Sequence, residues 1–236
     1  MAVTGALTGH RRSRRAGVLR AALKRTIDVT VAALALIALA PLLLLIALLI
    51  VLDSRGPVFY RADRAGFRGR PLRMLKFRKM HADARGGALT VTDDERLTRL
   101  GAWLVRSKLD ELPQLWHVVR GDMSLVGPRP ESPEHVERFS AAYEVILRVR
   151  PGLTGYTQVA FAREGAILDT RDPYTHYVSR LLPQKVELDR LYATRCGIRR
   201  DLWILGATIV TVVLRQPVAV DRVTGRLTLR RRVGER

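Results

Sequence analysis

The chain has 236 residues, a formal net charge of +19 and a single cysteine, Cys196. This length suits one domain of ordinary size with appendages, and its core needs no disulfide. One cysteine excludes an internal disulfide framework and a cysteine-rich zinc site. The charge indicates anionic partners: nucleic acid, acidic lipid headgroups or phosphorylated substrates. Aromatic residues make up 6% of the chain and do not alternate with basic ones, which disfavours a stacking platform for single-stranded nucleic acid.

The first 53 residues indicate a membrane attachment. Residues 1–21 are rich in arginine and glycine without periodicity and predict a basic, mobile tail near acidic lipid headgroups. Residues 22–53 contain the apolar run 29–52, interrupted by Thr30 and Pro41. As a straight helix this run would be roughly 36 Å long, enough to cross a hydrocarbon core of about 30 Å. The long basic start and the length of the run argue against a cleavable signal peptide.

Basic residues lie on both sides of the apolar run. Because the positive-inside rule keeps such flanks on the cytoplasmic side, a straight span would carry one of them across the membrane. A helix broken at Pro41 would enter and leave on the same face, since each arm of about twelve residues, roughly 18 Å, is too short to span. We therefore predict a re-entrant membrane helix over residues 22–53. The alternative is an ordinary spanning helix with a tolerated proline.

The rest of the chain predicts an α+β fold that is mainly helical. Residues 57–80 contain two β-prone runs around the glycines at 66 and 69, which indicates a hairpin. Helical spacing or helix-stop signals predict helices over residues 98–107, 109–120, 133–149, 183–194 and 198–214. Residues 217–229 alternate around Thr224-Gly225 and indicate a second hairpin. The expected organisation is a globular domain over residues 54–215 and a C-terminal hairpin or tail over residues 216–236.

The segment KLDELPQLWHVVRGDMSLVGPRP, residues 108–130, carries the candidate chemistry. Pro113 fits the first turn of a helix, which places Asp110 at or near the N-cap and Glu111 just inside. Backbone N–H groups and the helix dipole would keep such a carboxylate ionised, and they also attract phosphate. An Asp-Glu pair at a helix start is often only a cap and a first-turn acid. The basic residues that accompany it favour a site instead: Lys76, Arg78, Arg106, Lys108 and Arg129.

These basic residues leave two interpretations open. Arg129 lies between two prolines and loses little entropy on ordering, so it suits either a phosphate clamp or an ion pair with a local carboxylate. Lys76, Arg78 and Lys79 suit either phosphate binding or a solvated, lipid-facing surface. Four histidines share no metal-ligand spacing and are interpreted as structural: His81, His117, His135 and His176.

Five segments in order resemble the bacterial sugar transferase family: KRTIDV with the proline-broken apolar run, KFRKM, LDELPQL, GDMSLVGPRP and RPGLTG. These are the monotopic phosphoglycosyl transferases that start glycan assembly on polyprenyl phosphate, and the resemblance covers about residues 22–215. It implies transfer of a sugar 1-phosphate from a UDP-sugar to polyprenyl phosphate, in bacteria undecaprenyl phosphate, with release of UMP. It further implies dependence on Mg²⁺ and a covalent aspartyl-phosphosugar intermediate.

Carried onto this chain, the resemblance makes Asp110 the nucleophile and Glu111 its Mg²⁺-associated neighbour. The substrate phosphates are expected at Lys76, Arg78, Arg106, Pro128 and Arg129. It also implies a catalytic domain, residues 54–215, on the cytoplasmic face of the bacterial inner membrane, where it would initiate exopolysaccharide, O-antigen or glycoconjugate assembly. There are two departures. Ala40 stands where relatives often have serine, and the sequence after RPGLTG differs, which leaves the sugar open.

Two rival classes explain less of the sequence. A membrane-tethered nucleic-acid-binding or scaffold protein accounts for the charge but gives Asp110, Glu111 and the GPRP segment nothing to do. A multispanning transferase with direct attack needs more apolar segments than this chain has. The expected partners are therefore a UDP-sugar, polyprenyl phosphate and anionic membrane lipids, without nucleic acid. The glycan pathway and the oligomeric state stay open, with a homodimer among the possible states.

Overall fold

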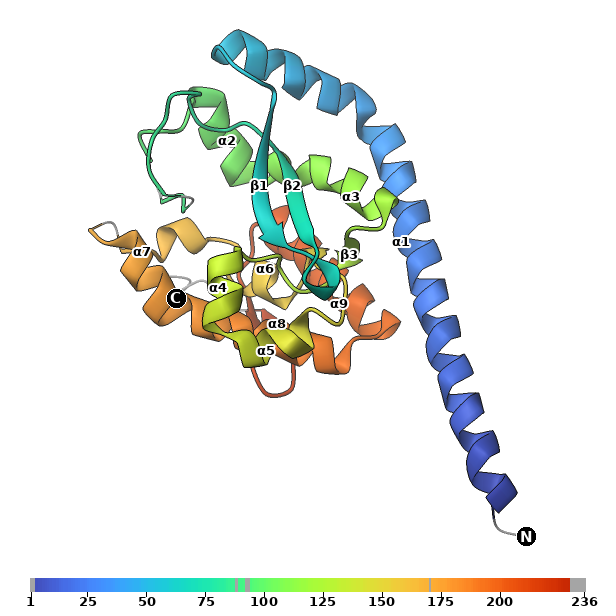
Figure 1. Ribbon diagram of the computed structural model, residues 1–236. Coiled ribbons are helices and arrows are strands. Elements are labelled where there is room, and N and C mark those ends of the chain that lie inside the picture. Colours follow the sequence, from blue (N-terminus) through green and yellow to red (C-terminus); the bar gives the residue numbers. More distant parts are fainter. Residues whose placement is uncertain (1–2, 88, 92–93, 170, 230–236) are drawn as a thin grey trace.

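The computed structural model describes residues 3–87, 89–91, 94–169 and 171–229, and within these ranges the side chains from residue 17 onward (Figure 1). Its first half comprises α1 (Val3–Asp53), β1 (Phe59–Ala65), η1 (Phe67–Gly69), β2 (Pro71–Phe77), α2 (Arg99–Ser107), η2 (Leu109–Gln114), α3 (Leu115–Arg120) and β3 (Ser124–Val126). The second half comprises α4 (Pro133–Arg138), α5 (Ser140–Ile146), β4 (Gly152–Thr154), α6 (Tyr156–Ala160), η3 (Glu164–Ala166), α7 (Pro173–His176), η4 (Tyr177–Leu181), α8 (Leu182–Arg195), α9 (Ile198–Val212), β5 (Val218–Val220) and β6 (Leu227–Leu229). In the described ranges the strands form only two-stranded sheets, so the mainly helical α+β prediction is confirmed.

The helix α1 is longer than the sequence predicts. Its helical backbone begins at Val3 and includes the stretch interpreted as an aperiodic tail. Alanine, leucine and arginine are strong helix formers, so a helix nucleated in the apolar run extends readily into this stretch. Its 51 residues correspond to about 76 Å, more than twice the thickness of a hydrocarbon core. Figure 1 shows that α1 changes direction between its dark-blue beginning and its light-blue end.

In the described part of the chain, α1 is the one helix that is long and apolar enough to cross a membrane. It passes through Pro41 without ending. Many of its apolar side chains face away from the rest of the protein, with Leu34 62%, Ile37 73% and Leu44 72% exposed. The other face packs onto the globular part, where Ala32 and Ile46 are buried. The exposed apolar surface is consistent with contact with lipid.

The predicted hairpin is confirmed as the antiparallel pair β1–β2, with Phe59 opposite Phe77 and Ala65 opposite Pro71. Along β2, Leu72 and Met74 are buried because alternate side chains of a strand face the same side. Lys76 continues this inward series at the end of β2. The strand therefore carries a basic side chain to the edge of the core, next to η2.

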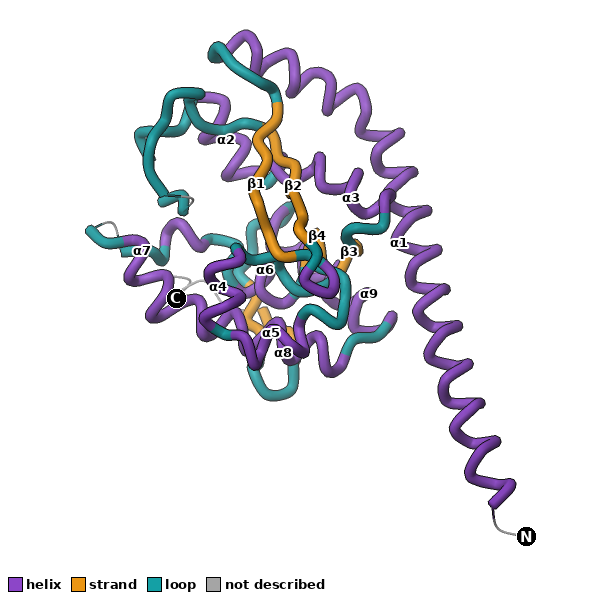
Figure 2. The backbone as a smooth tube through the Cα atoms, viewed as in Figure 1, coloured by secondary structure: helices purple, strands orange, loops and turns teal. Residues whose placement is uncertain are grey.

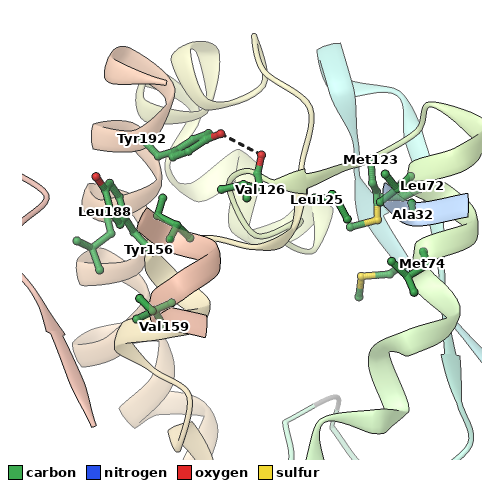
Figure 3. Close-up of a cluster of buried hydrophobic side chains, with 14 of the residues drawn as sticks. Ala32, Leu72, Met74, Met123, Leu125, Val126, Tyr156, Val159, Leu188 and Tyr192 are labelled. Atoms are coloured by element: carbon green, nitrogen blue, oxygen red, sulfur yellow. Dashed lines mark hydrogen bonds between the residues drawn. The ribbon is translucent and has the colours of Figure 1, made fainter. Parts of the chain in front are cut away.

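The central core joins the hairpin, α3 and α9. Figure 3 shows Val126 between two groups of apolar side chains, one including Met74 and Leu125 and the other Tyr156 and Leu188. Within this core β3 and β4 pair in parallel, and Figure 2 labels these two short strands close to each other. A side chain at Gly127 would approach the Arg150 carbonyl oxygen to 2.4 Å, so only glycine permits this close packing. The pairing fixes the backbone immediately before the Pro-Arg-Pro segment.

The remaining helices build the lower part of the protein in Figure 1. The helix predicted over residues 133–149 is divided into α4 and α5 at Phe139, whose backbone is not helical. α5, η4 and α8 share a second apolar cluster that contains Tyr143 and Leu182. The predicted C-terminal hairpin is confirmed as β5–β6, with Gly225 at a φ of +72° in its turn. Residues 230–236 of the predicted tail lie outside the described residues.

Candidate active site

A cavity of about 940 Å³ lies where the end of β2, the 3₁₀ helix η2 and the segment after β3 meet. Five of the residues predicted for the site line it: Lys76, Arg106, Asp110, Glu111 and Arg129. Long-range packing brings them together, because β2 lies against η2 and the β3–β4 pair positions the Pro-Arg-Pro segment. The cavity is large enough for a nucleotide-sized ligand.

Glu111 is the centre of an ion-pair network in this cavity. Its Oε1 accepts hydrogen bonds from Lys76 Nζ at 2.8 Å and from Arg129 Nη2 at 2.9 Å. Arg129 Nη1 lies 3.5 Å from Oε2. Burial alone would raise the pKa of Glu111, but the charges of Arg129 and Lys76 outweigh it and hold that pKa well below its ordinary value. Glu111 is therefore ionised, and it orients two cations toward the cavity.

Asp110 is buried, with 4% of its surface exposed. It lies in the first turn of η2, near the N-cap as predicted, but Lys108 occupies the N-cap position and no side chain caps the helix. The helix start therefore does not by itself set the ionisation of this carboxylate. Burial raises the pKa of Asp110, and the negative charge of Glu111 raises it further, against the opposing charge of Lys76 and other lysines. An ionised Asp110 is consequently poorly solvated.

Two further lysines face Asp110 and complete the cationic lining. Burial lowers the pKa of Lys79 to about 8, against the opposing charge of Asp110. Burial also lowers the pKa of Lys108, which turns the chain between α2 and η2 with a positive φ of 60°. The surface interpretation of Lys79 is thus wrong, because this residue lines the cavity.

A close backbone approach, which the sequence did not reveal, positions Lys79. A side chain at Gly101 would lie 1.8 Å from the Lys79 carbonyl oxygen, so α2 can pack onto this strand end only with glycine there. The Lys79 carbonyl also accepts a hydrogen bond from the Thr98 backbone N–H at 3.0 Å. A glycine inside an amphipathic helix is the sequence signal that could have indicated this contact.

Arg78 does not lie at the predicted phosphate site. Its Nη1 donates to the Arg55 carbonyl at 2.6 Å, and its Nη2 donates to the carbonyls of Ser54 at 2.6 Å and Ile50 at 3.3 Å. Ile50 belongs to the last turn of α1, and Ser54 and Arg55 follow its last residue, so Arg78 holds the C-terminal end of that helix. Lys76 lies within β2 and reaches the cavity in register with Leu72 and Met74, whereas Arg78 lies just beyond the end of the strand at Phe77 and turns to α1.

Pro128 also positions the backbone and does not lie at the predicted phosphate site. Its carbonyl accepts a hydrogen bond from the Gly152 backbone N–H at 2.8 Å. It is not among the described residues that line the cavity. The proline therefore holds the backbone of Arg129 against β4, and the guanidinium beyond it reaches the site.

A buried ionic network that sequence reasoning missed supports the far wall of the cavity. Glu131 accepts a hydrogen bond from the Tyr177 hydroxyl at 2.9 Å and lies 3.7 Å from Lys185 Nζ. Lys185 also donates to Glu164 at 2.9 Å. Burial opposes ionisation of Glu131, but the charge of Lys185 and a hydrogen bond from His135 outweigh it and lower the pKa of Glu131 to about 2. These residues come from three separate parts of the chain, so no local pattern could have indicated their association.

The carboxylates fit a metal that arrives with substrate, not a preformed metal cage. Within the described ranges, no three His, Cys, Asp or Glu side chains gather as a metal site. Mg²⁺ commonly uses only one or two carboxylates and takes its other ligands from substrate phosphates and water. Asp110 and Glu111 line the same cavity, and Glu111 Oε2 has only the long contact with Arg129. Together with a diphosphate they provide suitable oxygen ligands.

The fold and cavity describe a protein with an apolar helix and a cationic site built around two carboxylates. The model of the family described as bacterial sugar transferase matches residues 19–215. The chain belongs to the bacterial sugar transferase family, as its motifs predicted.

Three relatives illustrate the range of the match. The chain is 42% identical over 195 residues to the UDP-glucose:undecaprenyl-phosphate glucose-1-phosphate transferase of Caulobacter vibrioides, covering 80% of this chain and 69% of the relative. It is 41% identical over 199 residues to the undecaprenyl-phosphate glucose phosphotransferase of Komagataeibacter xylinus, covering 79% and 35%. It is 39% identical over 173 residues to the exopolysaccharide production protein ExoY of Sinorhizobium fredii, covering 66% and 76%. The chain thus spans about a third of the Komagataeibacter protein and about two thirds of the Caulobacter one.

Proposed function

We propose that this protein transfers a sugar 1-phosphate from a UDP-sugar to undecaprenyl phosphate and releases UMP, the first step in assembling an exopolysaccharide or related glycan. The observation that carries the proposal is the buried Asp110 carboxylate beside the Glu111–Arg129–Lys76 network in one cavity. UDP-glucose is the favoured donor, because the names of the Caulobacter and Komagataeibacter relatives specify glucose.

The cationic lining supports binding of a diphosphate. Arg129 presents a planar fork that Glu111 holds in place, and Lys76 adds a second charge on the same carboxylate. Such preorganised donors stabilise charge on a transferring phosphoryl group more effectively than mobile surface residues, because they need little reorganisation during the reaction. Glu111 therefore acts as an orienting residue for the two cations. Lys79 and Lys108 supply further charge close to Asp110.

The reaction would proceed in two displacements at one phosphorus atom. First, an Asp110 carboxylate oxygen attacks the phosphorus that carries the sugar, and the bond to the bridging oxygen breaks. UMP leaves with the electron pair, and the sugar phosphate stays on Asp110 as an acyl phosphate. Second, a phosphate oxygen of undecaprenyl phosphate attacks the same phosphorus, the bond to Asp110 breaks, and the carboxylate is restored. No proton is gained or lost overall, and one site handles both substrates in turn.

Mg²⁺ would be held by Glu111 and the substrate phosphates, with Asp110 close by. When bound, it would neutralise diphosphate charge and thereby ease the departure of UMP. The residues of the chain perform the remaining work: Arg129 and Lys76 orient the phosphates, and the walls around Asp110 limit access of water to the acyl phosphate.

The site would face the cytoplasm, with α1 entering and leaving the membrane on that side. The basic residues on both flanks of the apolar run, the proline within it and the change of direction of α1 support this topology. Single cysteines at Gly17 and Asp53, in a Cys196→Ser background, can be treated in intact cells with a membrane-impermeant thiol reagent. Both positions should react only after the cells are opened. Labelling of the Gly17 position alone from outside would show a spanning helix instead.

The function is tested with purified full-length protein in vesicles that contain undecaprenyl phosphate. UMP release is measured for UDP-glucose and a panel of other UDP-sugars, with and without Mg²⁺. The proposal expects UMP release and a lipid-linked sugar diphosphate with at least one donor, and near-complete loss of both in Asp110→Asn. UMP release by Asp110→Asn at a rate close to wild type would contradict the assignment of the nucleophile.

A further inference from the structure

A second cavity, of about 1,140 Å³, lies away from the proposed reaction site. It is bounded by the N-terminal part of α1, the turn between α8 and α9, and the β5–β6 turn. It has no lining residue in common with the first cavity. We call it the α1–α9 groove.

The groove is strongly cationic. Nine basic side chains and one carboxylate, Asp28, line it. Asp28 is already neutralised within the protein, since it accepts a hydrogen bond from Ser124 at 2.6 Å and lies 3.6 Å from Lys24 Nζ. The lining therefore has a large excess of positive charge with no acidic residue left to balance it.

Some of these basic side chains bind other groups of the protein, and others do not. Lys24 pairs with Asp201 at 2.7 Å, and Arg25 donates to the Val118 carbonyl at 2.6 Å. By contrast, three arginines have exposed side chains with no hydrogen bond or ion pair among the described residues: Arg20, Arg199 and Arg226. They come from α1, α9 and the β5–β6 turn, so three different walls direct uncommitted guanidinium groups to one groove. This arrangement suits an anion with several oxygen acceptors.

The position of the groove indicates which anion it meets. Its α1 wall, residues 17–28, comes directly before the apolar run 29–52, whose side chains are largely exposed. On the α9 wall, Trp203 lines the groove and is 66% exposed, and Leu202 beside it is 64% exposed. Tryptophan next to basic residues at the end of an apolar helix is typical of the headgroup level of a membrane.

We propose that the α1–α9 groove binds the phosphate headgroup of an anionic phospholipid, separately from the lipid-phosphate substrate. The phosphodiester oxygens would accept hydrogen bonds from Arg20 and Arg199, and the acyl chains would lie along the exposed apolar face of α1. A dissolved anion would leave Trp203 and that apolar face without a role. An acidic protein partner would have to approach along the membrane-attached helix, where lipid is already present at high local concentration.

The test counts lipids retained by the full-length protein when it is released from nanodiscs of phosphatidylglycerol and phosphatidylcholine into a native mass spectrometer. The variant is Arg20→Gln/Arg199→Gln. The matched control, Arg180→Gln/Arg190→Gln, removes the same charge from exposed arginines that do not line the groove. Each groove arginine should contribute about fivefold to affinity, so the double variant should bind phosphatidylglycerol about 25-fold more weakly, while the control matches wild type.

Preferential retention of phosphatidylglycerol that is lost only in the groove variant is the expected result. Equal loss in both variants would mean that net charge alone attracts the lipid, and would overturn the site. Retention of phosphatidylcholine at the same level would do so as well. Displacement of phosphatidylglycerol by millimolar inorganic phosphate would assign the groove to a free anion instead. The readout is lipid count rather than turnover, so the result is independent of the proposed transferase activity.

Discussion

Lys79 gives the sharpest prediction about how the site responds to pH. Its pKa is lowered to about 8 by burial, and its charge helps to keep the Asp110 carboxylate ionised. Deprotonation of Lys79 should therefore remove a positive charge that stabilises both the Asp110 carboxylate and the bound diphosphate. Lys79→Arg keeps a charge at this position throughout the accessible pH range, because arginine does not lose its proton in proteins.

The size of the effect follows from that pKa. With a pKa of about 8, Lys79 is about nine-tenths charged at pH 7 and about one-tenth charged at pH 9, so kcat/KM should fall about tenfold over this interval. In Lys79→Arg the same interval should change kcat/KM less than about twofold. At low pH the rate should fall in both proteins as Asp110 takes up its proton, at a pH above the ordinary pKa of an aspartate.

The assay is UMP release under subsaturating UDP-sugar, which reports groups of the free enzyme. The ratio of kcat/KM at pH 7 to that at pH 9 is the quantity to compare, because the larger arginine can alter the absolute rate. Lys108→Arg serves as the control, since it also changes a lysine of this cavity to arginine. An unchanged tenfold fall in Lys79→Arg, or its disappearance in the Lys108→Arg control alone, would refute the role of Lys79.

Three further changes test other parts of the account. Arg129→Lys should lower kcat/KM about 30- to 1,000-fold, because the ammonium group of lysine cannot reproduce the paired hydrogen bonds of a positioned guanidinium. Full activity of this variant would show that net charge suffices. Glu111→Gln should lower the free energy of unfolding by about 3 to 5 kcal/mol at neutral pH, since Lys76 and Arg129 lose their partner. Because the folded pKa of Glu111 is depressed, this difference should vanish as pH falls through that pKa, and a pH-independent difference in chemical denaturation would contradict it. Arg78→Met should lower the thermal midpoint in detergent with KM unchanged, whereas a rise in KM alone would return Arg78 to phosphate binding.

Local patterns predicted most of the secondary structure, since hairpins and amphipathic helices depend on neighbouring residues. The β1–β2 and β5–β6 hairpins and the end of α3 at Gly121 are confirmed. The parallel β3–β4 pair was missed because each strand has three residues and the partners lie 28 positions apart. The beginning of α1 at Val3 was missed because arginine-rich sequence suits both a mobile tail and an extended helix.

The sequence predicted which residues form the candidate site, but not the ionisation of Asp110 or the contacts of Arg78. The motifs and the family resemblance that they carry indicated Asp110, Glu111, Lys76 and Arg129, which the structure brings to one cavity. The ionisation of Asp110 could not be inferred, because it depends on burial by distant segments and not on its helix position. Neither could the place of Arg78, which depends on where α1 ends relative to β2.

The central claim is that Asp110 forms a covalent bond to the sugar phosphate. It is tested most directly by incubating the wild-type protein with UDP-glucose and Mg²⁺ in the absence of a lipid acceptor, followed by rapid acid quench and intact mass spectrometry. The account predicts a mass increase of one hexose phosphate, equal in amount to the UMP released, located on the peptide that contains Asp110 and absent from Asp110→Asn. Undecaprenyl phosphate added before the quench should remove it. An adduct on another residue, or UMP release that requires the lipid acceptor and leaves the protein mass unchanged throughout, would contradict the covalent mechanism.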